Sequence, residues 1–172
     1  MYRTLADFRN RWQEESDDTL KVLSAIPDTA LHQAVSPEHR DLARLAWHLV
    51  ESLKTLPAKI GLEVEGPELG PGGLFTEPAP QTMAEIRSAY ARASTSLLTS
   101  LESWTDATLA QEDDLYGQRW TRGTTLMALS MHQAHHRGQM TVLMRQAGLP
   151  VPEFYGPTKE GWAAYGVPVP IV

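Results

Sequence analysis

Four stretches of the chain carry apolar residues every three or four positions, and this spacing restricts the possible folds more than any other feature. The spacing predicts helices over residues 4–26, 36–56, 82–104 and 124–147. Ser36 followed by Pro37 is expected to begin the second helix, and the capping-box pattern Thr82-x-x-Glu85 to begin the third. The sequence therefore predicts an all-α protein.

A stretch rich in glycine and proline, from Gly61 to Pro80, separates the second and third predicted helices. About 20 such residues are unusual in a compact domain unless they cross the fold or border a site, so we interpret them as a crossover connection. The Gly-Pro-Gly-Gly run at 70–73 is not followed by Gly-Lys-Ser/Thr, which argues against a phosphate-binding loop. Residues 1–172 are expected to form one domain, a four-helix bundle with a long crossover between helices 2 and 3.

The charge and the missing cysteines exclude several classes of function. The chain has 15 basic and 21 acidic residues, a net charge of −6, and no cluster of Lys or Arg. Nucleic acids and anionic membranes bind such clusters, so neither is an expected partner. Without cysteine, only His, Asp, Glu and water can bind a metal. The chain starts without a signal-peptide core and has no apolar run of about 18 residues, so we expect a cytoplasmic protein.

Three of the six histidines lie close together in the fourth predicted helix, at His132, His135 and His136. His132 and His136 project from one side of a helix, about 40° apart around its axis and about 6 Å apart along it. Both lie on or beside the apolar stripe, where imidazoles without partners would be costly. A shared metal ion would satisfy them, but so would hydrogen bonds to backbone or water, and the spacing leaves both explanations open. His135 points away from the pair and is not expected to be a ligand.

A third histidine, His48, lies beside the apolar stripe of the second predicted helix. A lone histidine there is usually a core residue, but metal sites in four-helix bundles are built from inward-facing side chains of different helices. His48 and the pair on the fourth helix fit that rule. Three imidazoles leave at least one coordination position open, which is typical of catalytic rather than structural zinc sites.

Other polar residues are weaker candidates. Glu51 is the carboxylate nearest to His48 on its helix and is expected at the surface. Residues 105–122 are predicted to form a polar, solvated loop, although its acidic side chains could contact a metal or substrate. Arg137 could bind an anionic substrate group, but a structural role near the helix end is the favoured interpretation.

The motifs around these histidines resemble those of the DinB-like (YfiT-like) metalloenzyme family. The first is Leu45-Ala46-Trp47-His48-Leu49-Val50-Glu51, and the second is His132-Gln133-Ala134-His135-His136-Arg137-Gly138-Gln139. The resemblance continues through residues 144–152 and covers nearly the whole chain in order and spacing. The His-His-Arg-Gly-Gln run is the more specific of the two motifs.

The resemblance implies an up-down-down-up four-helix bundle, often a homodimer, with one divalent metal ion, zinc or nickel, bound by three histidines. Matched position by position, the ligands are His48, His132 and His136. Some family members use low-molecular-weight thiols as co-substrates. The resemblance implies nothing about DNA binding, despite the origin of the family name in damage-inducible genes.

Two enzymatic hypotheses and one non-enzymatic hypothesis follow, with catalytic residues beyond the metal centre unidentified. The metal activates a low-molecular-weight thiol for S-transfer to a small electrophile, or a metal-bound hydroxide hydrolyses a small-molecule substrate. Hydrolysis usually needs a nearby proton acceptor, and Gln133 stands where the zincin motif has Glu, which argues against a protease-like site. Thiol transfer is favoured mainly because the family resemblance implies it. The third hypothesis is a bundle that binds a metal without catalysis.

Overall fold

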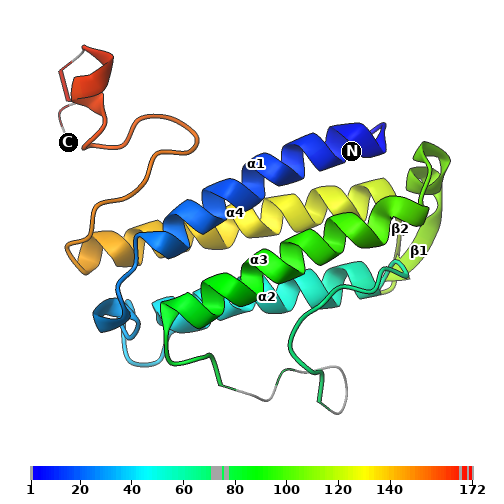
Figure 1. The fold of residues 1–172 in the computed structure, drawn as a ribbon, viewed down its shortest axis with the longest axis horizontal. Helices are drawn as coiled ribbons and strands as arrows, with labels where there is room; N and C mark the ends of the chain where they lie inside the picture. Colours follow the sequence, from blue (N-terminus) through cyan, green and yellow to red (C-terminus); the bar gives the residue numbers. More distant parts are fainter. Residues whose placement is uncertain (1, 71–74, 76–77, 167, 170, 172) are drawn as a thin grey trace.

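The four α-helices lie side by side and form the body of the protein (Figure 1). The computed structural model describes residues 2–70, 75, 78–166, 168–169 and 171. The helices are α1 (Leu5–Ser24), α2 (Leu42–Ala58), α3 (Met83–Ser100) and α4 (Arg122–Gln146). Helices α1 and α4 run in one direction and α2 and α3 in the other (Figure 1). The predicted all-α, up-down-down-up four-helix bundle is therefore confirmed.

The order of the helices around the bundle places α2 beside α4. Helices α1 and α2 each pack against both α3 and α4. Leucines at three- and four-residue spacing bury the inner face of α2, including Leu42, Leu49 and Leu53, which have no exposed surface. Side chains of α2 and α4 can therefore meet in the seam between these two antiparallel helices.

The long connection between α2 and α3 has no helix or strand among its described residues. Residues 71–74 and 76–77, which include most of the Gly-Pro-Gly-Gly run, lie outside the described part of the chain. Among the described helices, none combines the length and the apolar character that crossing a membrane requires.

The start of the second helix was predicted wrongly. Ser36 begins only a single turn. The His39 amide donates to the Ser36 carbonyl, and the Ser36 hydroxyl contacts the side chains of Glu38 and His39. The chain then becomes extended, and Asp41 caps α2 by accepting a hydrogen bond from the Arg44 amide at 2.8 Å. By contrast, Thr82 caps α3 as predicted, because its hydroxyl accepts from the Glu85 amide.

The loop predicted over 105–122 is in fact structured. A 3₁₀ turn at Asp106–Ala110 precedes an antiparallel hairpin of β1 (Glu112–Leu115) and β2 (Gln118–Thr121). Tyr116 and Gly117, both with positive φ, form a two-residue turn, which matches the right-handed twist of the two strands. The strands were missed because they are polar rather than alternating, and ion pairs such as Arg122–Asp113 at 2.9 Å join the ends of the hairpin.

A network of polar side chains buried between α1 and α4 also fixes the C-terminal segment. Arg137 of α4 has no exposed surface and donates to Glu15 Oε2 at 2.6 Å, and to Thr19 Oγ1 and the Glu15 carbonyl at 3.0 Å. Tyr155, beyond α4, donates its hydroxyl to Glu15 Oε2 at 2.6 Å. Glu15, 2% exposed, thus interrupts the apolar inner face of α1 with a buried carboxylate.

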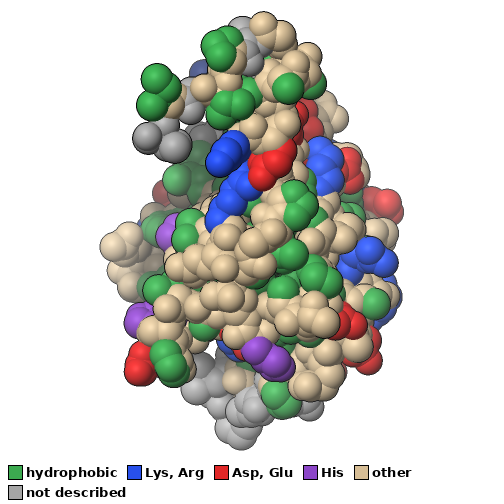
Figure 2. Space-filling model, turned by 90° about the vertical axis from the view of Figure 1, so that its left-hand side faces the viewer, with side chains coloured by type: hydrophobic (Ala, Val, Ile, Leu, Met, Phe, Trp, Pro, Cys, Tyr) green, Lys and Arg blue, Asp and Glu red, His purple; other side chains and the backbone are tan. Residues whose placement is uncertain are grey.

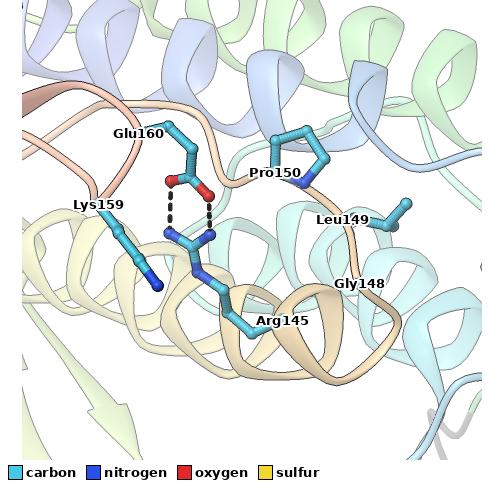
Figure 3. Close-up of a pocket in the computed structure, with 6 residues that line it drawn as sticks. All are labelled: Arg145, Gly148, Leu149, Pro150, Lys159 and Glu160. Carbon is cyan, nitrogen blue, oxygen red and sulfur yellow. Dashed lines mark hydrogen bonds and ion pairs between the residues drawn. The ribbon is translucent and has the colours of Figure 1, made fainter. Parts of the chain in front are cut away.

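The last segment leaves the bundle after this contact (Figures 1 and 2). Trp162–Tyr165 form a short 3₁₀ helix, with Tyr165 59% exposed. Arg145, near the end of α4, forms a two-pronged ion pair with Glu160, with 2.8 Å between Nη2 and Oε2 (Figure 3). Since both partners are well exposed, the pair fastens the segment weakly.

Candidate metal centre

The seam between α2 and α4 brings together the three histidines singled out in the sequence. His48 comes from α2, and His132 and His136 come from successive turns of α4. One ring nitrogen from each lies within 4.8 Å of the other two. The ring centroids are 4.4 Å apart for His132 and His136, and 4.6 and 5.1 Å from His48 to His136 and His132.

A buried glutamine fixes the distance between the two helices at this level. Gln133, the residue after His132, has no exposed surface and donates to the Leu49 carbonyl at 3.2 Å and to Ser52 Oγ at 2.9 Å. Because Leu49 directly follows His48, these bonds hold the histidines of the two helices in register. Gln133 therefore holds the two helices together. Its amide cannot act as the general base that the glutamate of the zincin motif supplies.

The spacing of the nitrogen atoms fits a metal ion. His132 Nε2 and His136 Nε2 lie 3.1 Å apart. Two nitrogen ligands on a tetrahedral zinc ion at about 2.05 Å would lie about 3.3 Å apart. No other cluster of three or more His, Asp or Glu side chains with this proximity occurs among the described residues. The three histidines are thus suited to hold a divalent ion, with at least one coordination position left open.

Burial keeps the two histidines of α4 neutral, which is the form that binds metals. Burial, with the neighbouring His136 and His48, lowers the pKa of His132 to about 4. Burial is also the largest cause of a lowered pKa at His136. The Nδ1 atom of His132 is buried without a hydrogen-bond partner among the described residues. At neutral pH His132 and His136 therefore offer lone pairs rather than positive charge.

Glu51 lies behind His48 rather than at the surface, so its predicted position was wrong. Its side chain is 1% exposed, and Oε2 lies 3.4 Å from His48 Nδ1 while also pairing with Arg44. The pKa of Glu51 is lowered because hydrogen bonds from His48 and Arg44 outweigh the effect of burial. The carboxylate thus favours the His48 tautomer with a proton on Nδ1 and a lone pair on Nε2.

Gln139 has the same role for His136, and no argument from the sequence singled it out. Its Oε1 lies 2.7 Å from His136 Nδ1, and its Nε2 lies 3.1 Å from His135 Nε2. His135 is exposed and outside the group of three, as predicted. The signal for Gln139 was its position three residues after His136, on the same side of the helix.

The remaining candidates lie away from the cluster. Arg137 is structural, as favoured, but its partners are on α1 rather than at the end of its own helix. Asp113 pairs with Arg122, and Asp114 Oδ1 accepts from the Gly117 amide at 3.0 Å. The acidic side chains of the hairpin are therefore engaged locally.

Comparison with known proteins places this geometry in a family. The family whose sequence model matches residues 1–168 is described as the DinB family. The chain is 39% identical to the protein YrdA of Bacillus subtilis over 171 residues, which cover 99% of both chains.

Solved structures agree with this assignment. A DinB-like protein from Bacillus cereus superposes with a TM-score of 0.83 at 38% identity, over 90% of this chain and 100% of that one. A second DinB-like protein, YjoA of Bacillus subtilis, is similar in fold alone, with a TM-score of 0.64 at 16% identity over 86% of this chain and 97% of that one. The resemblance noted in the two histidine motifs thus reflects descent, and the chain belongs to the DinB family.

Proposed function

We propose that this protein is a metal-dependent transferase, in which one divalent ion on His48, His132 and His136 activates a low-molecular-weight thiol for transfer of its sulfur to a small electrophile. The observation that carries the proposal is the convergence of three ring nitrogens within 4.8 Å, from two helices that are locked in register. Zinc and nickel are the proposed ions, because neutral imidazole suits both.

The number of ligands favours catalysis over a purely structural role. A structural zinc site is normally closed by four protein ligands. The described part of the chain supplies three, and the nearest carboxylate, Glu51, is held behind His48 by its bonds to Arg44 and His48. A fourth position is thus available to a substrate.

The environment of the cluster favours a thiol over water as the nucleophile. Hydroxide attack benefits from a proton acceptor beside the metal. Gln133 is an amide and cannot accept a proton, and Oε2 of Glu51 pairs with Arg44 and with His48 Nδ1. A divalent ion would lower the pKa of a coordinated thiol, so that the co-substrate brings its own nucleophile.

Self-association into a homodimer is a further part of the proposal. Met131 and Val142, 63% and 54% exposed, lie on the same side of α4, eleven residues apart. Sedimentation of the wild type and of Met131→Asp tests it: we expect a dimer that the substitution weakens, and a monomeric wild type would contradict it.

A paired-substrate assay tests the proposed activity. Zinc- or nickel-loaded protein is given cysteine together with 1-chloro-2,4-dinitrobenzene, or 4-nitrophenyl acetate without thiol. In the first reaction a carbon–sulfur bond forms, the carbon–chlorine bond breaks, chloride leaves and the thiol proton goes to solvent. We expect turnover that requires both the metal and the thiol, and that is lost in His48→Ala.

The other outcomes select the alternatives. Hydrolysis of the ester with no thiol present would indicate a metal-dependent hydrolase. Bound metal with no turnover of either substrate, but with a large loss of thermal stability on chelation, would indicate a non-catalytic metal-binding bundle.

A further inference from the structure

A cavity of about 260 Å³ opens in the same seam between α2 and α4, one helical turn from the histidine cluster. Its walls are largely apolar and come from the segment before α2 and from both helices, at Val35, Leu45, Val142 and Leu143. Leu45 precedes His48 by one turn on the same side of α2. The cavity is thus a continuation of the site along the bundle.

Gln139 connects this cavity with the histidines. It lines the cavity, and its Oε1 lies 2.7 Å from Nδ1 of His136. A molecule in the cavity would therefore lie beside the amide that orients one of the three histidines.

Among the described residues, the arginine that lines this cavity is Arg40. Its guanidinium forms no hydrogen bond or ion pair with the described residues, and the adjacent carboxylate of Asp41 is turned to His32 and to the Arg44 amide. Arg40 lines the same cavity as Gln139, whose Oε1 contacts Nδ1 of His136. An unpaired guanidinium at the mouth of an apolar cavity is suited to bind a carboxylate.

We propose that this cavity binds the apolar body of a small carboxylic acid, whose carboxylate is held by Arg40, as the electrophilic substrate of the metal centre. This assignment of the substrate class rests on the function proposed above. The volume is below the 300 Å³ or more that is usual for drug-sized ligands, so the acid is small.

Binding of a matched pair of probes tests the proposal without any turnover. The probes are 3-phenylpropionate and 3-phenylpropan-1-ol, which share an apolar body and differ in charge. Their binding is measured by calorimetry on protein stripped of metal with a chelator, so that the carboxylate cannot bind a metal ion. We expect the wild type to bind the acid with a Kd that is roughly millimolar or tighter, and the alcohol more weakly.

Two variants and a control distinguish the contribution of the Arg40 charge to binding from that of the apolar cavity wall. Arg40→Gln should weaken binding of the acid roughly threefold to tenfold and leave that of the alcohol unchanged, since one partly exposed charged contact is lost. Val35→Ser, on an exposed segment, should weaken both probes alike. Arg3→Gln makes the same change of charge just before α1, at the hairpin end of the bundle, and should bind as the wild type does.

The outcomes distinguish this proposal from the proposed function. Absence of acid binding in the wild type, or an Arg40→Gln variant that binds the acid as tightly as the wild type, overturns the substrate class, whatever the metal does. Specific acid binding that Arg40→Gln weakens supports it, even if metal loading or thiol transfer fails in the separate assay.

Discussion

Two polar side chains behind the histidines decide how well the cluster can bind a metal. Glu51 Oε2 and Gln139 Oε1 lie 3.4 Å and 2.7 Å from the Nδ1 atoms of His48 and His136. Such partners fix the ring tautomer and orientation, and their loss typically costs about 10- to 100-fold in metal affinity. They should therefore matter almost as much as the ligands.

Replacement of Glu51 by Gln should weaken zinc binding about tenfold, because the neutral amide holds the His48 ring less firmly and leaves Arg44 without its buried partner. Competition with a chromogenic chelator measures the affinity. Glu63→Gln makes the same change at an exposed carboxylate and should have no effect. Equal affinities for both variants would show that Glu51 does not support the ligand.

The stability of the metal-free protein should depend on pH through His132. The pKa of His132 is about 4 in the folded state, compared with an ordinary value of 6.5. Between pH 4 and pH 6.5 the unfolded chain therefore binds more protons than the folded protein. The free energy of unfolding should therefore decrease as pH falls from about 6.5 toward 4, by at most ~1.4 kcal/mol per pH unit from this one group. Denaturant titrations across this range should show a shallower dependence in His132→Gln, and an unchanged slope would contradict the shift.

At the scale of the elements, Tyr155 joins the C-terminal segment to the polar network between α1 and α4. Its hydroxyl lies between Glu15 of α1 and Arg137 of α4, 2.7 Å from Arg137 Nη2. A buried ion pair contributes little net stability when complete, but an incomplete one is costly because a charge is left without its partners. The tyrosine completes this pair from outside the helices.

Tyr155→Phe should lower the free energy of unfolding by about 1 kcal/mol, since it removes only the hydroxyl that satisfies Glu15 and Arg137. Chemical denaturation measures the change. Tyr165→Phe is the matched control, because Tyr165 is similarly exposed and, among the described residues, its hydroxyl donates to Glu153 alone, at 3.3 Å. A loss as large in the control as in Tyr155→Phe would argue against a specific role of the buried network.

The helices could be predicted from the sequence because apolar spacing is a local property, and each helix differs from its prediction by only a few residues, apart from the start of α2. The histidine cluster followed from spacing along α4 together with the family resemblance. Glu51, by contrast, lies on the same helix as His48, yet its burial depends on Arg44 and on packing that spacing does not reveal.

Local spacing could not predict that Arg137 pairs with Glu15, because the two residues lie 122 positions apart in the sequence. The hairpin was also missed, since β1 and β2 are too polar to alternate and their pairing depends on the positive-φ turn at Tyr116 and Gly117. The first difference thus depends on a contact between distant residues, and the second on a local turn between strands that show no alternating pattern.

For the whole molecule, a bound ion would link α2 to α4 and so stabilise the bundle. Ligand that binds only the folded state raises the free energy of unfolding by about 4 kcal/mol at a thousandfold excess over Kd. Zinc should therefore raise the Tm of the wild type and leave that of His48→Ala nearly unchanged, as measured by calorimetry. Equal shifts in the two proteins would place the ion elsewhere.

The metal content of the purified protein tests the three-histidine centre most directly. The protein is prepared without a histidine tag, loaded with zinc or nickel, desalted and analysed by mass spectrometry of the elements. We expect about one equivalent in the wild type and in His135→Ala, and almost none in His48→Ala, His132→Ala or His136→Ala. Equal metal in all five proteins, or none in the wild type after loading, would contradict a centre built from α2 and α4.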